Sequence, residues 1–160
     1  MRYTSNDIYK LLEKIKDPEI PVLSLVDLGI IKHVDVAGDE VRVVITPTFV
    51  GCPALDTMRS DIESVLRENG VRDLSVEVSF REPWTSDLLS EKGRKALKRY
   101  GLAPPPQGVL ITDLDILENV ECPRCSGRNT ELKSAFGSTL CRSIHYCNDC
   151  RESFEQFKPL

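Results

Sequence analysis

Two Cys-x-x-Cys pairs near the C-terminus constrain the fold of this chain more than any other feature. Cys122 and Cys125 form the first pair, Cys147 and Cys150 form the second, and 21 residues lie between the pairs. Four thiolates arranged in this way can surround one metal ion tetrahedrally, because each short turn points two sulfurs inward. Residues 119–160 are therefore predicted to form a four-cysteine zinc ribbon with one structural zinc ion per chain. Iron also accepts four thiolates, but we favour zinc.

The two turns differ in sequence. The first reads CPRCSG, in which Pro123 fixes φ after the first ligand and Gly127 is expected to supply backbone freedom beyond the second. The second turn, CNDCRE, has no glycine and is expected to rely on Asn148 and Asp149, which tolerate turn geometry. The separation of the pairs slightly exceeds the usual range of about 15–20 residues, so the loop between them should be slightly long.

An alternative interpretation of the cysteines is two disulfides in a secreted domain. The N-terminus has no apolar run of signal-peptide length, and no apolar stretch of membrane-spanning length occurs in the chain. We therefore expect a cytoplasmic protein with reduced thiols and no membrane partner. The formal net charge is −4, and in residues 119–160 Lys and Arg exceed Asp and Glu by one. Such a balance argues against nucleic acid as the main partner.

Residues 1–82 read as one small α+β domain. Apolar residues at helical spacing predict a first helix that is capped by Thr4 or Ser5 and ends before Pro18. Strands are predicted at 31–36 and 41–46 around a hairpin turn, a second helix from about Pro53 to Asn69, and a third strand over 74–80. The order α-β-β-α-β indicates helices packed on a mixed sheet.

Residues 83–118 are predicted to be a helical, Pro-rich connector. A cap within Thr85–Asp87 should begin a short charged helix that runs to Tyr100, and three prolines follow at 104–106. Trp84, the only tryptophan, is expected to pack this helix onto the first domain rather than to bind a ligand.

Cys52 is the candidate reactive group of the first domain. It lies just after a predicted strand and just before a predicted helix, where backbone N–H groups and the helix dipole favour a thiolate. Thr46 and Thr48 can place hydroxyls at the same strand end, and Asp17 and Glu19 offer carboxylates. One thiol cannot hold a metal alone, so binding here would be shared, transient or intermolecular. The alternative is an inert buried cysteine.

The chain does not contain a complete set of residues for thiol catalysis. A nucleophilic cysteine needs a base, and the only histidines are His33 and His145. His33 is expected to face solvent on a strand, and His145 to be a neighbour of the metal site rather than a ligand. Cys141 is expected to fill the ribbon core, although an alternative ligand or a second free thiol also fits its position.

Several segments resemble known families. DPEIPVLSLVDLGII and VRVVITPTFVGCPALDTMRSDIESVL resemble the small domain of factors that assist iron-sulfur protein maturation, including SufT-like proteins. Together with EPWTSDLLSEKGRKALKRYGLAPP, ECPRC, FGSTLC and CNDCRESFEQFKP, they make the nearly full-length chain similar to the PaaD family of the phenylacetate-degradation system.

The resemblance implies an accessory role rather than catalysis by the chain alone. The expected partners are the oxygenase and reductase subunits of a multicomponent phenylacetyl-CoA epoxidase, whose iron or iron-sulfur centre the chain would help to mature or repair. Cys52 would contact transient iron or a cluster, with Asp17, Glu19, Thr46 and Thr48 around it. A non-catalytic zinc-ribbon scaffold that bridges subunits is the alternative, and self-association into a homo-oligomer is compatible with the sequence.

Overall fold

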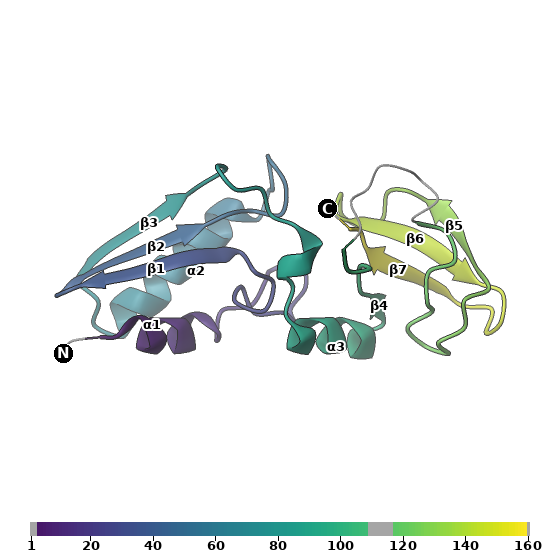
Figure 1. Ribbon diagram of the computed structural model, residues 1–160, viewed down its shortest axis with the longest axis horizontal. Coiled ribbons are helices and arrows are strands. Elements are labelled where there is room, and N and C mark those ends of the chain that lie inside the picture. Colours follow the sequence, from purple (N-terminus) through teal and green to yellow (C-terminus); the bar gives the residue numbers. More distant parts are fainter. Residues whose placement is uncertain (1–2, 109–116, 160) are drawn as a thin grey trace. The chain divides into compact units, whose positions relative to one another are not determined.

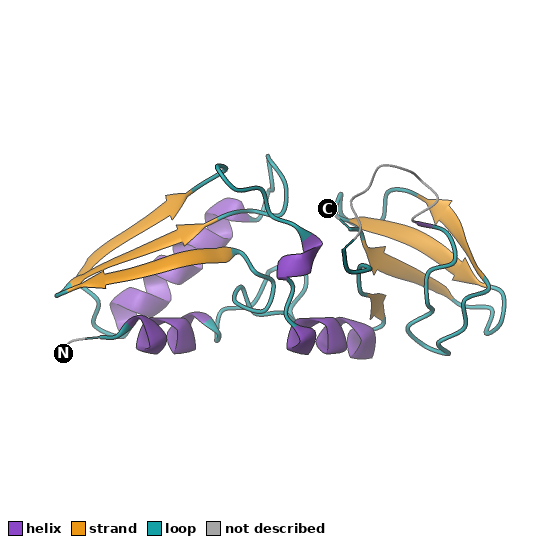
Figure 2. Ribbon diagram, in the orientation of Figure 1, coloured by secondary structure: helices purple, strands orange, loops and turns teal. Residues whose placement is uncertain are grey.

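The computed structural model describes residues 3–108 and 117–159 (Figure 1). Contacts divide the chain into two compact units, Met1–Trp84 and Thr85–Leu160. In Figure 2 the first unit combines helices with a three-stranded sheet, whereas the second unit contains a four-stranded sheet. Part of the expected connector, residues 109–116, lies outside the described residues. Within the described residues, no helix is long and apolar enough to cross a membrane.

The first unit opens with helix α1 (Ser5–Leu12), which starts where the sequence predicts. Thr4 is its N-cap: its hydroxyl accepts a hydrogen bond from the Asp7 N–H at 3.2 Å. In return, the Asp7 carboxylate accepts the Thr4 N–H at 3.0 Å, which completes a capping box. Ile8 and Leu12 are fully buried, so the apolar stripe of the helix faces the core.

The sheet of the first unit has the order β1-β2-β3. Strands β1 (Ile31–Ala37) and β2 (Glu40–Ile45) pair antiparallel, and β3 (Asp73–Val78) pairs parallel to β2. Helix α2 (Leu55–Glu68) connects the two parallel strands. The predicted mixed sheet and element order are confirmed. The third strand is shorter than predicted, since it ends at Val78 and leaves Phe80 52% exposed.

Trp84 is a packing residue of the first unit. Its side chain is 4% exposed, and its indole Nε1 donates a hydrogen bond to the Leu28 carbonyl oxygen at 2.8 Å. Because a buried indole N–H needs an acceptor, this bond fixes the end of the unit to the turn that precedes β1. This position agrees with the expectation that Trp84 is a packing residue.

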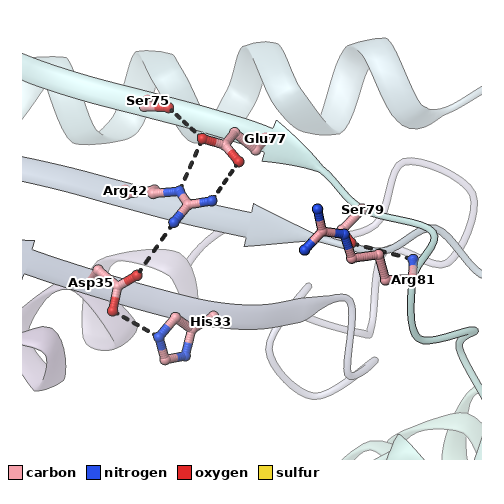
Figure 3. A network of polar contacts seen from close by, with 7 residues as sticks. All are labelled: His33, Asp35, Arg42, Ser75, Glu77, Ser79 and Arg81. Carbon is pink, nitrogen blue, oxygen red and sulfur yellow. Dashed lines mark hydrogen bonds and ion pairs between the residues drawn. The ribbon is translucent and has the colours of Figure 1, made fainter.

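One face of the first sheet is polar (Figure 3). Arg42 on β2 donates two hydrogen bonds to Glu77 on β3, at 2.9 and 2.7 Å, and its guanidinium holds the pKa of Glu77 below its usual range. Asp35 on β1 lies 4.0 Å from Arg42 and 2.7 Å from His33. His33 is exposed, as expected. Because these ion pairs are exposed, they contribute little to stability; the apolar side chains point to the opposite face.

The second unit begins with a short 3-10 turn (η1, Ser86–Leu88) and helix α3 (Glu91–Tyr100). The predicted cap within Thr85–Asp87 is wrong: Ser90 is the N-cap, and its hydroxyl accepts the Gly93 N–H at 2.9 Å. Extended backbone at Leu89 separates the turn from the helix. Gly101 ends α3 in the left-handed conformation, as expected for a C-terminal glycine.

The second sheet has the order β4-β7-β6-β5. Its strands are β4 (Leu102–Ala103), β5 (Thr130–Ser134), β6 (Arg142–Cys147) and β7 (Ser153–Phe157). Strands β5, β6 and β7 form an antiparallel meander, and β4 pairs parallel to β7. The small core of this sheet contains Ala103, Val120, Cys122, Cys147 and Phe154. The expected C-terminal ribbon is therefore present.

Changing Thr4 to Ala should destabilise the first unit by about 1 kcal/mol, because the N-terminal N–H groups of α1 lose their cap. The buried Trp84 provides the measurement, since its fluorescence reports urea unfolding of this unit alone. Thr57→Ala is the matched control, because Thr57 is exposed on α2 and caps nothing. An equal loss of stability in both variants would contradict the capping role.

Candidate metal centre

Four cysteine sulfurs converge in the second unit. The Sγ atoms of Cys122, Cys125, Cys147 and Cys150 all lie within 4.8 Å of one another. The closest pairs are Cys122 with Cys150 at 3.7 Å and Cys125 with Cys147 at 3.6 Å. In a tetrahedron with metal–sulfur bonds of about 2.3 Å, neighbouring sulfurs are about 3.8 Å apart. The four thiols therefore fit one ion, and a multinuclear cluster would need a wider separation of its ligands.

The two Cys-x-x-Cys turns have the same backbone hydrogen bonds. In the first, the Ser126 N–H donates to the Cys122 carbonyl at 2.9 Å, and the Cys122 N–H donates to the Gly127 carbonyl at 2.9 Å. In the second, the Arg151 N–H donates to the Cys147 carbonyl at 2.8 Å, and the Cys147 N–H donates to the Glu152 carbonyl at 2.9 Å. Equivalent turns thus present both sulfur pairs.

The residue after each second cysteine adopts a left-handed backbone. Ser126 has φ +60° and Arg151 has φ +62°. The expected source of backbone freedom, Gly127, is therefore not the left-handed residue. Glycine leaves space there instead, since a Cβ at this position would lie 2.2 Å from Asp149 Oδ2 and 3.2 Å from Cys125 Sγ, and the Asp149 carboxylate would have to move. Sequence reasoning missed Ser126 and Arg151, although both occupy the same place in their motifs.

The cysteines differ in their exposure. Cys122 and Cys147 are fully buried in the small core, Cys150 is half-buried, and Cys125 is exposed. The centre is therefore anchored in the sheet by one cysteine of each turn and open to solvent at Cys125. Since buried ligands hold the turns in place, the site is suited to structural support of the unit.

His145 and Cys141 lie outside the group of four thiols. His145 is fully buried, its Nε2 lies 2.8 Å from Ser143 Oγ, and its ring stacks on Phe154. Burial lowers the pKa of His145 to about 4, so the ring is neutral. Cys141 is also buried and lies 3.0 Å from the Thr139 hydroxyl. Both positions agree with a packing role.

Cys52 is half-buried and follows β2 in the segment that leads to α2. Its carbonyl accepts the Leu55 N–H at 3.3 Å, at the start of the helix. Thr46, at the same strand end, is buried, and its hydroxyl donates to the Ser79 carbonyl at 2.9 Å. Thr48 is half-buried. Thr46 therefore lies at the carboxyl end of the parallel strands β2 and β3, and Thr48 and Cys52 follow it in the segment that leads to α2.

Asp17 and Glu19 lie in the turn that follows α1. The Asp17 carboxylate is buried and accepts the N–H groups of Glu19 and Ile20, at 2.8 and 2.7 Å. Asp17 therefore shapes this turn. Among residues 3–108 and 117–159, the four ribbon cysteines are the only close group of three or more potential metal-ligating Cys, His, Asp or Glu side chains. Cys52, Asp17 and Glu19 remain a predicted site.

Comparison with known proteins identifies a protein family that each unit resembles. Residues 5–79 match the family profile described as iron-sulfur cluster assembly protein, and residues 110–158 match the PaaD zinc beta ribbon domain. A crystal structure of a DUF59 domain from Bacillus anthracis matches with a TM-score of 0.54 and 31% identity, over 58% of this chain and 90% of that one. The fold therefore combines an iron-sulfur-assembly-type α+β unit with a zinc-ribbon unit.

One similar sequence covers both units. It is a putative 1,2-phenylacetyl-CoA epoxidase subunit of Escherichia coli, 37% identical over 96% of this chain and 92% of its own length. An Fe-S protein maturation auxiliary factor of Porphyromonas gingivalis is 37% identical over 56% of this chain and 86% of its own length. The chain belongs to the PaaD family of phenylacetyl-CoA epoxidase subunits.

Removal of the metal should unfold the ribbon and spare the first unit, because the energy of metal binding is folding energy in so small a core. We expect one metal ion per chain by elemental analysis, and loss of metal in Cys122→Ser. A strong chelator should abolish the tertiary NMR signals of residues 117–159 while Trp84 fluorescence stays native. Cys141→Ser is the control and should keep its metal. Full occupancy in Cys122→Ser with Cys147→Ser would contradict the assignment.

Replacing Ser126 or Arg151 with Gly should stabilise the metal-bound ribbon by up to about 1 kcal/mol, because glycine adopts the left-handed backbone without strain. The measurement is the free metal concentration at half occupancy in competition with a chelator. Arg124→Gly is the control: Arg124 does not have positive φ, so glycine there should weaken retention by increasing the freedom of the unfolded chain. If Ser126→Gly and Arg151→Gly retain the metal as weakly as Arg124→Gly, glycine does not relieve backbone strain at these positions.

Proposed function

We propose that this chain is an accessory protein of a multicomponent phenylacetyl-CoA epoxidase, in the cytoplasm. It assists maturation or repair of the iron or iron-sulfur centre of the oxygenase or its reductase. The observation that carries the proposal is the combination of units: an iron-sulfur-assembly-type domain is joined to a PaaD-type ribbon. The relative that matches nearly the full chain is named as an epoxidase subunit.

We propose that the ion of the ribbon is zinc and that it has a structural role. Four thiolates are a common ligand set for structural zinc, and an ion without redox chemistry suits a site whose task is to hold the fold. Cys122 and Cys147 anchor the centre in the core, and no ligand position is left open for substrate. Iron delivered to a client would therefore be handled elsewhere in the chain.

We assign that transfer role to Cys52. The thiol is half-buried, so a client can reach it, and it precedes the helix end where N–H groups favour a thiolate. Thr46 and Thr48, which follow β2, and the carboxylates of Asp17 and Glu19 form the proposed surroundings of this thiol. One thiolate cannot fill the coordination shell of an iron ion or a cluster. The iron or cluster is therefore bound transiently, and ligands of the client complete its coordination.

The test is a comparison of cells that contain the epoxidase subunits with wild-type chain, Cys52→Ser, Cys141→Ser or no added chain. We expect iron content and activity of the purified oxygenase to fall in Cys52→Ser to the level without the chain. Serine preserves the volume but removes the soft ligand, so Trp84 fluorescence and metal content of the ribbon should stay native. Cys141→Ser should support full loading.

The alternative function is a non-catalytic scaffold in which the ribbon bridges subunits. In that case Cys52→Ser would load the oxygenase fully, whereas loss of the ribbon through Cys122→Ser would abolish assembly. The isolated chain serves as a further control, and we expect no turnover of phenylacetyl-CoA by it with any electron donor, because it lacks a complete catalytic set.

A further inference from the structure

The loop that joins β5 to β6 (residues 135–141) lies at the end of the ribbon opposite the metal centre. At the metal end, Thr130 on β5 pairs with Cys147 on β6, whereas Ser134 pairs with Ile144 near the loop. Strand β6 covers Arg142–Cys147, and at about 3.3 Å per residue it places roughly 17 Å between the loop and the thiols. The loop therefore lies well away from the metal centre.

This loop exposes two large apolar side chains. Phe136 is 65% exposed and Leu140 is 61% exposed. A single exposed apolar residue is ordinary on a protein surface, but two in one short loop place more apolar area in water than a single residue would. Their burial against a partner would remove this apolar area from water and favour association.

The loop is held in one conformation by a partly buried ion pair. The Glu155 carboxylate on β7 accepts hydrogen bonds from Ser138 N at 2.7 Å, Ser138 Oγ at 3.1 Å and Arg142 Nη1 at 2.9 Å. A Cβ at Gly137 would lie 2.9 Å from Arg142 Cβ and 3.2 Å from its backbone carbon, so the backbone approaches β6 closely. A loop fixed in this way loses little entropy when it binds.

The loop region has a small positive excess. Arg142 is paired with Glu155, and Lys133 is paired with Glu131. Lys158 adds a cation, since its Nζ donates to the Ala135 carbonyl at 3.0 Å and lies 5.1 Å from the centre of the Phe136 ring. Charge complementarity therefore favours a partner whose apolar contact surface is bordered by carboxylates.

The comparisons indicate which unit distinguishes this chain from the maturation factors. Three maturation factors align with 51% to 57% of this chain but use 86% to 93% of their own length. Each is therefore too short to contain both units. The relative that contains the whole chain is instead named as an epoxidase subunit. The added unit is thus the part expected to select a particular client.

We propose that Phe136 and Leu140 form a docking surface for one protein subunit of the oxygenase system, at an apolar patch bordered by Asp or Glu. This inference rests on the proposed function, because it names the surface through which the accessory protein recognises its client. Phe136 and Leu140 supply the apolar contact, Glu155 and Arg142 hold the loop, and Lys158 supplies the positive charge.

The test measures the Kd of the full-length chain for each purified oxygenase and reductase subunit, by calorimetry or surface plasmon resonance. Phe136→Ser with Leu140→Ser should bind one of these subunits at least tenfold more weakly than wild type. Leu88→Ser is the matched control, since Leu88 is a 41% exposed apolar residue of the same unit outside the loop. The affinity of this variant for the subunits should equal that of wild type. Higher ionic strength should weaken wild-type binding.

Folding is checked separately: the double variant should keep one metal ion per chain and the thermal unfolding midpoint of wild type. If the double variant loses its metal, the affinity of Leu140→Ser alone is measured instead, and it should also be weaker than that of wild type. Unchanged affinity in the folded variant, or no binding of any subunit to wild type, would overturn the proposal. A change in oligomeric state by light scattering with unchanged subunit affinity would assign the loop to self-association instead.

The two proposals fail separately. Binding that persists in the loop variant while Cys52→Ser still prevents iron loading would refute the docking surface and leave the maturation role. Binding that is lost in the loop variant while Cys52→Ser supports full loading would refute the transfer role of Cys52 and leave the docking surface.

Discussion

The convergence of four thiols on one ion is the constraint on which the second unit depends. The described core of this sheet is small, and two of its members are the ligands Cys122 and Cys147. Apolar burial alone is weak in so small a core, so we expect metal coordination to supply much of the folding energy. The same coordination fixes both Cys-x-x-Cys turns and the end of the β5–β6 hairpin at Thr130 and Cys147.

The first unit is stabilised in a different way. Its sheet and two helices bury an extended apolar core that includes Ile8, Leu12, Val43, Ile62 and Leu66. Folding of this unit therefore does not depend on the metal centre of the ribbon, and the chemistry that we propose for Cys52 lies in a unit with its own apolar core. The similar proteins are consistent with two units that fold independently. Maturation factors of about the size of the first unit are known, and the PaaD family has the ribbon in addition.

The proposed roles assign different tasks to the two units. In the first, a half-buried thiol between β2 and α2 handles transient cargo. In the second, a rigid metal-supported hairpin presents an apolar loop at the end away from the ion. The loop is fixed by Glu155 and Arg142. In these proposals, recognition of a client and the chemistry at Cys52 involve different residues, so each can be tested by its own substitution.

The sequence determined the element order, the mixed sheet and the four-cysteine ribbon, because apolar periodicity and ligand spacing are local properties of the chain. It did not determine the cap of α3, which Ser90 provides, because several neighbouring residues can each cap a helix and only packing selects one. The left-handed backbone at Ser126 and Arg151 was also revealed only by the structure. Two turns must close on the same ion, and this long-range constraint overrides the local preference of both residues. Likewise, the close approach at Gly137 arises from Arg142, which only the fold brings near.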